Sequence, residues 1–260
     1  MSVITLTTDF GTHDWFVGTM KGVIACIAPK ATIIDLTHDL PPGDIRGGAF
    51  ALSASYRFFP KGTVHLVVVD PGVGSRRKAI AVKTAKAVFV GPDNGVLSWA
   101  LAKERVIAVH VLENEAYFLH PVRRTFHGRD VFAPVAAHLS CGVPIKKFGP
   151  ALKRFVRLDW PEPRRQRGGF EGEVVHIDRF GNAITNLESS LLRGSDRALC
   201  EGSTRRRWVC PLRPFFQAVP PKAPVAIIGS SGYLEIAVNG GSAEAVLGLR
   251  TGDRVALRLA

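Results

Sequence analysis

The stretch that carries the most chemistry places a carboxylate and a guanidinium just after an apolar run. Residues 66–69 are one leucine and three valines, a pattern typical of a strand buried on both faces, and a proline two positions later ends its hydrogen-bond ladder. Asp70 is therefore expected at the carboxyl end of this strand, where open α/β sheets bind ligands. Gly72 and Gly74 permit a tight turn that returns Arg77 toward Asp70. On its own, this pair is equally well interpreted as a structural salt bridge.

Polar clusters also follow other predicted strands. Because the carboxyl ends of parallel strands share one edge of a sheet, we expect these side chains to face one cleft. Their convergence favours one functional site over several unrelated surface features. The candidates at this edge are Asp9, Asp14, Asp70, Asp93 and His127.

Three common kinds of catalytic site find little support in the sequence. No H-x-H or H-x-x-x-H pair occurs, so we expect no metal centre. A G-x-S-x-G turn is also missing, and the cysteines lie in apolar or basic neighbourhoods, which disfavours a serine or cysteine nucleophile. The glycines at 72 and 74 lack the further glycine and the helix of a phosphate-binding loop. An Asp, an Arg and a His that converge without metal indicate a polarised water, oriented by the carboxylate.

A layered α/β domain is needed to hold these residues. Strand-like and helix-like segments alternate over residues 1–160, which predicts an α/β domain with a mainly parallel central sheet. Residues 161–169 are rich in Pro, Gly and Arg without apolar periodicity, which is typical of a linker. Short strand candidates separated by turn residues fill 170–260 and predict a smaller, all-β, barrel-like domain. We expect strands at 4–8, 32–36, 63–69, 79–84, 87–91, 106–112, 170–178, 208–212, 223–228, 233–238 and 254–259, and helices at 15–27, 48–56, 95–101 and 131–140.

Composition bounds the class of protein. The 260 residues are 46% hydrophobic and 22% charged, as in ordinary globular proteins, and no apolar run approaches the length of a membrane span. Since the first residues lack the basic segment of a signal peptide, we expect a cytoplasmic protein. Much of the net charge of +12 lies in Arg164–Arg167 and Arg205–Arg207 without interleaved aromatic residues, so we expect solvated surface and no nucleic-acid partner. In a reducing compartment we expect free thiols at Cys26, Cys141, Cys200 and Cys210.

Six short motifs stand in an order shared with a known enzyme family. They are Thr8–Gly11, Val69–Gly74 with Arg77, Gly91–Gly95, Thr125–Asp130, Asp178–Asn182, and Ser230–Ala237 with Asn239. With these motifs the chain resembles the S-adenosylmethionine (SAM) hydrolases, or SAM hydroxide adenosyltransferases, which are relatives of the fluorinase and chlorinase enzymes. The resemblance covers nearly the whole chain, and the ordered set is specific although each motif alone is weak.

The resemblance implies hydrolysis of SAM to adenosine and methionine, with SAM as the substrate and no further cofactor. It places the water-activating set on Asp70, Arg77 and His127, for in-line attack on the ribose C5′. The sulfonium departs as a neutral thioether, so the leaving atom needs no proton. Which of the three residues takes the proton of the water stays open.

Substrate contacts are also implied by the resemblance. Asp9 matches the residue that binds the ribose diol, which suits a side chain with two acceptor oxygens. Asp14 and Asp178 match groups around the methionine ammonium. Phe180 matches a stacking contact with adenine and Asn182 an amide hydrogen bond to it.

A last turn is expected to receive the methionine carboxylate through Ser230 and Ser231. The fluorinase has an arginine where Ser231 stands, so recognition here is expected to depend on backbone donors. Gly229 replaces an asparagine of many relatives. Family members are homotrimers with each site between the first domain of one subunit and the β domain of its neighbour, and the same is expected of this chain.

Two rivals of different classes remain. Halogenases similar to this chain carry an aromatic hydroxyl where Asp70 stands, and the fluorinase has a halide-contacting serine at the position of Gly128. A carboxylate repels a halide, so water is the favoured nucleophile. The rival outside catalysis is a nucleoside- or nucleic-acid-binding module that uses the positive charge.

Overall fold

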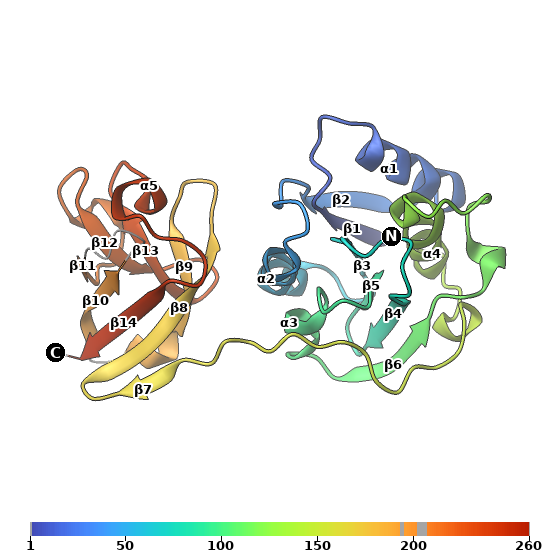
Figure 1. Cartoon of the computed structure of the whole chain (residues 1–260). Coiled ribbons are helices and arrows are strands. Elements are labelled where there is room, and N and C mark those ends of the chain that lie inside the picture. The colour runs from blue at the N-terminus through green and yellow to red at the C-terminus, as the bar shows by residue number, and fades with distance from the viewer. Residues whose placement is uncertain (1, 193–194, 202–206, 260) are drawn as a thin grey trace. The chain divides into compact units, whose positions relative to one another are not determined.

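The chain folds as two compact units, Met1–Asp159 and Trp160–Ala260 (Figure 1). The computed structural model describes residues 2–192, 195–201 and 207–259. Each unit has its own sheet and its own hydrophobic core.

A mixed six-stranded sheet forms the centre of the first unit. Its strands are β1 (Val3–Thr8), β2 (Thr32–Thr37), β3 (Val64–Val68), β4 (Ala79–Thr84), β5 (Val88–Pro92) and β6 (Val106–Val111), in the order β2-β1-β3-β5-β4-β6. β1, β2, β3 and β5 pair in parallel, whereas β4 is antiparallel to both of its neighbours. The prediction of a mainly parallel sheet is thus confirmed in part, since four strands pair in parallel within a mixed sheet. The reversal of β4 follows from its tight turn to β5, closed by the Thr84 N–H on the Ala87 carbonyl at 2.9 Å, because so short a connection joins only antiparallel strands.

Helices cover both faces of this sheet. They are α1 (Phe16–Ile27), α2 (Ile45–Ser55), α3 (Ser98–Leu101) and α4 (Ala133–Ser140), with short helical turns at Tyr56–Phe58, Glu115–Tyr117, Gly128–Phe132 and Ile145–Lys147. Leu66 and Val68 enter the core beneath α1 and α4, while Val67 and Val69 enter the core beneath α2 and α3. The run is apolar throughout because both faces of β3 are buried. Asp70 is the first polar residue to emerge from it.

The second unit is an antiparallel sheet bent into a nearly closed barrel. Its strands are β7 (Arg164–Gln166), β8 (Gly169–Ile177), β9 (Ala183–Glu188), β10 (Ser195–Glu201), β11 (Arg207–Pro211), β12 (Pro224–Ile228), β13 (Tyr233–Val238) and β14 (Arg254–Leu259), with short helices Ser189–Leu192, Phe216–Ala218 and α5 (Ala243–Leu247). They pair in the order β11-β10-β14-β8-β9-β13-β12, and β7 adds beside β8. A bridge between Leu212 and Ala226 connects the two ends of that order.

The segment expected as a linker, 161–169, contains part of this sheet. β7 pairs antiparallel with the start of β8, and Gly168 and Gly169 make the turn between them. Their φ angles are +79° and +155°, and a Cβ at Gly169 would lie 1.9 Å from the Leu257 carbonyl oxygen. Gly168 and Gly169 suggested a linker in the sequence, but the structure requires them because they form a hairpin turn that packs against β14.

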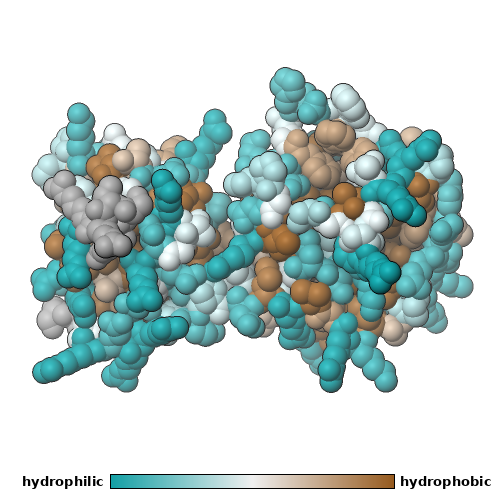
Figure 2. All heavy atoms as spheres, in the orientation of Figure 1, coloured by the Kyte–Doolittle hydropathy of each residue, from teal (hydrophilic) through white to brown (hydrophobic). Residues whose placement is uncertain are grey.

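Hydrophilic side chains cover much of the visible face of each unit (Figure 2). Arg164, Arg165 and Arg167 are exposed, as is Arg207. Arg205 and Arg206 of the second arginine cluster lie outside the described residues. No helix in the described part of the chain is long and apolar enough to cross a membrane. All four cysteines are free thiols, as predicted.

A buried histidine couples the stability of the first unit to pH. His65 on β3 is 1% exposed, accepts or donates one hydrogen bond with the Thr5 hydroxyl at 2.8 Å, and stacks on Phe89 with ring centroids 5.1 Å apart. Burial lowers the pKa of His65 from 6.5 to about 4. The folded protein therefore holds this ring neutral at pH values where the unfolded chain binds a proton.

We expect the free energy of unfolding to fall as the pH drops from 6.5 to about 4, because the unfolded chain alone gains a proton there. At about 1.4 kcal/mol per pKa unit, His65 contributes a loss of about 3 kcal/mol over this range and no further loss below it. Urea unfolding at several pH values measures the effect in the parent and in His65→Gln. An equally steep loss in His65→Gln would show that other groups cause it.

Candidate active site

The loop after β3 brings Arg77 back onto Asp70. Two turn hydrogen bonds shape it, from the Val73 N–H to the Asp70 carbonyl at 3.2 Å and from the Ser75 N–H to the Gly72 carbonyl at 3.1 Å. Gly74 has a φ of +75°, and a Cβ there would lie 2.4 Å from the Arg124 carbonyl oxygen. Glycine thus permits both the turn and its close approach to the segment that carries His127.

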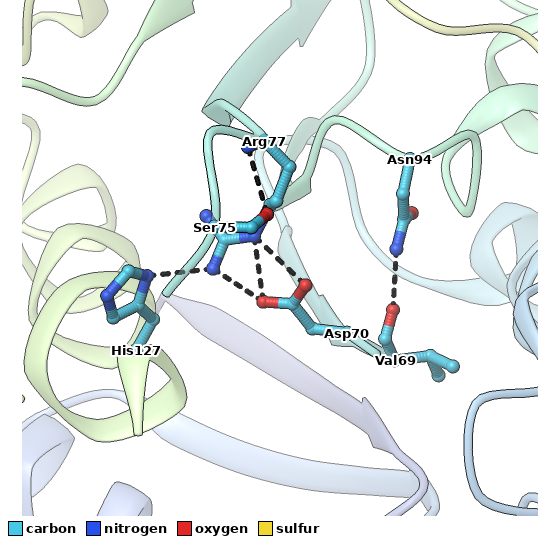
Figure 3. Close-up of polar contacts among 6 residues, drawn as sticks. All are labelled: Val69, Asp70, Ser75, Arg77, Asn94 and His127. Carbon is cyan, nitrogen blue, oxygen red and sulfur yellow. Dashed lines mark hydrogen bonds and ion pairs between the residues drawn. The ribbon is translucent and has the colours of Figure 1, made fainter. Parts of the chain in front are cut away.

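Asp70 and Arg77 form a buried, bidentate ion pair (Figure 3). The Arg77 Nε lies 2.9 Å from each carboxylate oxygen, and Nη2 lies 2.5 Å from Oδ2. The two side chains are 4% and 11% exposed, respectively. Two-point contact fixes the plane of the carboxylate, so its remaining lone pairs point in set directions.

His127 is the third member of this constellation, since Arg77 lies between it and Asp70 (Figure 3). The Arg77 Nη2 is 2.8 Å from the His127 Nδ1. A guanidinium only donates, so Nδ1 is the acceptor and the ring proton is on Nε2. Burial lowers the pKa of His127, the Arg77 charge lowers it further, and Asp70 and Asp130 oppose the shift. His127 is therefore a neutral imidazole, and its Nε2, which Arg77 does not contact, is a hydrogen-bond donor.

Asp130, which the sequence reasoning did not select, holds the His127 segment in place. This residue is fully buried and accepts a hydrogen bond from the Arg123 N–H at 2.8 Å and others from the Arg129 guanidinium. The hydrogen bond from the Arg123 N–H ties the segment before His127 to the helical turn that follows it. The position of Asp130 in the same motif as His127 was the available signal. Asn94 acts similarly on β3, where its amide donates to the Val69 carbonyl at 2.8 Å (Figure 3).

A small, largely apolar cavity opens beside the ion pair. Its volume is about 130 Å³, and both Asp70 and His127 form part of its wall. The other lining residues are Phe10, Phe16, Val68, Val73, Thr125, Phe126 and Gly128. A carboxylate and an imidazole N–H in a largely apolar pocket can hold and orient a water molecule.

Three of the predicted edge residues do not reach this cavity. Asp9 accepts a hydrogen bond from the Gly43 N–H at 2.7 Å, and Asp93 accepts one from the Val156 N–H at 2.7 Å. Asp14 lies on the exposed loop after β1, 3.7 Å from the His13 ring. Of the five residues predicted at this edge, only Asp70 and His127 line the cavity, and Arg77 joins them.

The second unit carries a larger pocket of about 990 Å³. Asp178, Phe180, Asn182 and Ser230 line it, which brings together four of the predicted substrate-binding residues. Phe180 is 76% exposed, as a ring available for stacking must be. Ser231 does not line the pocket, and its Oγ is buried without a hydrogen-bond partner among the described residues.

Within the described ranges, no cluster of three or more His, Cys, Asp or Glu residues is arranged to hold a metal ion. At the site, the Arg77 guanidinium contacts both the Asp70 carboxylate and the His127 imidazole.

Comparisons with known proteins agree with this arrangement. Models described as the SAM hydroxide adenosyltransferase N-terminal and C-terminal domains match residues 4–149 and 172–256. The (R)-S-adenosyl-L-methionine hydrolase of Thermus thermophilus is 42% identical, with 99% of this chain and 100% of the relative covered. The fluorinase of an Actinoplanes species is 29% identical, with 91% of each chain covered. A crystal structure of an uncharacterized conserved protein from Thermotoga maritima has a TM-score of 0.92 at 38% identity, covering 98% of this chain and 99% of that one. The chain belongs to the SAM hydroxide adenosyltransferase family.

Proposed function

We propose that this protein hydrolyses SAM to adenosine and L-methionine. The observation that carries the proposal is the Asp70–Arg77–His127 constellation at the wall of a small apolar cavity. Family membership and relatives named as SAM hydrolases support it. SAM is the substrate, and the reaction needs no further cofactor because the sulfonium is already an activated leaving group.

In the proposed mechanism, Asp70 orients the attacking water. The carboxylate accepts a hydrogen bond from the water, and Arg77 keeps the carboxylate in plane. The water oxygen bonds to C5′ as the C5′–S bond breaks, and the electron pair of that bond returns to sulfur, giving neutral methionine thioether. The water's proton passes to Asp70 and then to solvent. His127 Nδ1 is occupied by Arg77, so His127 serves as a hydrogen-bond donor through Nε2 and not as the base.

A halogenase reaction is disfavoured at this site. The Asp70 side chain is 4% exposed and lines the cavity in which a halide would have to lose its water. In such a poorly solvated place, repulsion between a carboxylate and a halide is strong. Water, which has both a donor for Asp70 and an acceptor for an imidazole N–H, fits the same groups.

The proposed substrate contacts follow the family resemblance. Asp9 binds the ribose diol, Phe180 and Asn182 bind adenine, and Ser230 and Ser231 receive the methionine carboxylate. Asp14 and Asp178 lie around the ammonium. We further propose a homotrimer in the cytoplasm, with sites shared between subunits.

The test is incubation of the purified protein with SAM, with and without chloride and with and without a chelator, followed by chromatography. Adenosine and methionine in equal amounts, unaffected by chelator or chloride, support the proposal. A 5′-halogenated nucleoside would indicate a halogenase. Unchanged SAM would contradict an enzymatic role on this substrate.

A further inference from the structure

A buried histidine close to the small cavity takes no part in the proposed mechanism. His38 directly follows β2 and is 5% exposed, and its Nδ1 lies 2.8 Å from the Thr8 hydroxyl oxygen at the end of β1. Thr8 is 0% exposed and pairs across the sheet with Val68, which lines the cavity. The contact between His38 and Thr8 therefore joins two strand ends beside the proposed reaction site.

Asp35 fixes the His38 ring from its other side. The His38 Nε2 lies 3.0 Å from the Asp35 Oδ1, and the Lys21 Nζ lies 2.6 Å from the Asp35 Oδ2. Burial raises the pKa of Asp35, but its contacts with Lys21 and His38 outweigh burial and hold that pKa below its usual value. Asp35 is therefore a carboxylate, which only accepts hydrogen bonds, so the His38 ring carries a proton on Nε2.

His38 and Thr8 together hold the backbone of the loop that follows β1. With its proton on Nε2, the neutral ring accepts the Thr8 hydroxyl proton at Nδ1, and the Thr8 oxygen in turn accepts the Phe10 N–H at 3.3 Å. The His38 carbonyl accepts the Gly11 N–H at 2.8 Å. Two successive backbone N–H groups are thus held by His38, one directly and one through Thr8.

Asp9 lies between these contacts, and it is the carboxylate that we propose for the ribose diol. Its Oδ2 accepts the Gly43 N–H at 2.7 Å, and Gly43 belongs to the same loop after β2 as His38. The loop after β2 therefore contacts both the backbone around Asp9 and its carboxylate. We infer that His38 is a positioning residue, which sets where Asp9 holds the ribose and thereby where C5′ lies relative to the water at Asp70. This inference rests on the proposed hydrolysis of SAM.

The test removes one side-chain contact of His38 at a time. In His38→Gln the amide reaches about as far as Nε2 and keeps only the contact with Asp35, whereas in His38→Asn it lies near the position of Nδ1 and keeps only the contact with Thr8. The substrates are SAM and its 2′,3′-dideoxy analogue, which has no diol for Asp9 to hold. His65→Gln is the matched control, since His65 is an equally buried histidine that contacts β1 at its middle and not at the loop.

For His38→Gln we expect kcat/KM for SAM to fall about ten- to a hundredfold, because a displacement of about 1 Å from the reactive geometry costs about a hundredfold in rate. The value for the analogue should stay close to that of the parent, since no diol is there to be misplaced. His38→Asn should keep most of its activity on SAM, and His65→Gln should change both substrates alike.

An equal fall for both substrates in His38→Gln would show a merely structural role, and no fall for SAM would show no role at all. Either result overturns the inference. If His38→Gln does not fold, as its melting curve shows, Thr8→Val takes its place, because it removes the hydroxyl and keeps the shape of the side chain. Thr8→Val should then show the same loss confined to SAM, and Thr8→Ser, which keeps the hydroxyl, should restore it.

Turnover of SAM by the parent tests the proposed function separately. If the parent forms adenosine, the comparison of the two substrates tests His38 alone. If the parent does not, the proposed function fails, and calorimetric Kd values of SAM and the analogue in the same variants still decide whether His38 positions Asp9.

Discussion

Replacing Asp70 by asparagine is expected to lower kcat for SAM hydrolysis by about a thousandfold, within the range of about 10²–10⁴ that general-base catalysis contributes. The amide has nearly the same size as the carboxylate, but it accepts no proton and carries no charge to orient the water. Since Asp70 is not among the residues proposed to bind adenine, the ribose diol or methionine, we expect the affinity for SAM to change little.

Steady-state kinetics gives kcat. Calorimetry with SAM gives the Kd of the inactive variant, which we expect to lie within about threefold of the parent's KM, a difference of less than about 1.4 kcal/mol in binding free energy. Glu113→Gln, which removes an exposed negative charge from the same unit, controls for a general electrostatic effect. A kcat for Asp70→Asn close to that of the parent would refute the assignment of the water to this carboxylate.

Replacing Arg77 by methionine is expected to affect both stability and activity. The variant leaves the 4%-exposed Asp70 carboxylate without its cation and His127 Nδ1 without its donor. Loss of one partner from a buried ion pair typically costs about 3–5 kcal/mol. We expect that loss in the free energy of unfolding, together with loss of SAM turnover because the carboxylate is no longer held in plane.

The double variant Asp70→Asn/Arg77→Met separates the two effects. Without a charge at position 70, removal of the guanidinium leaves no buried ion unpaired, so the double variant should recover a large part of the stability and none of the activity. Arg76→Met is the matched control: Arg76 is the exposed neighbour in the same loop and has no ion pair in the described part of the chain. Urea unfolding measures the stabilities. An Arg77→Met protein as stable as Arg76→Met would argue against the buried pair as a stabilising contact.

Local sequence patterns were sufficient to predict that Asp70 lies at the end of a strand and that Arg77 lies close to it. An apolar run buried on both faces, a proline and two glycines specify where the strand ends and that the chain turns back within seven residues. The contact from Arg77 to His127 spans 50 residues, and the family motifs predicted it, since no local pattern does. Asp9 and Asp93 were placed at the correct edge, but strand ends do not fix side-chain direction, and each carboxylate is held by a nearby backbone N–H.

The barrel shows what local patterns miss. β9 was not predicted because it buries polar residues: Thr185 and Asn186 are 0% and 1% exposed and donate to the carbonyls of Leu234 and Pro161. Those partners are distant in sequence, so alternation of polar and apolar residues gives no sign of the strand. β10 begins with a serine and two charged residues, which resembles a loop.

The size of the cavity beside Asp70 has a consequence for which acceptors can receive the adenosyl group. With a volume of about 130 Å³, the cavity has room for a small number of water molecules. The aromatic rings of Phe10, Phe16 and Phe126 line this space, so it cannot enlarge without disturbing the core. In the proposed reaction, a sugar alcohol or a peptide thiol is much larger than this space beside Asp70, whereas water fits it. The small cavity therefore favours water over larger nucleophiles as the acceptor of the adenosyl group.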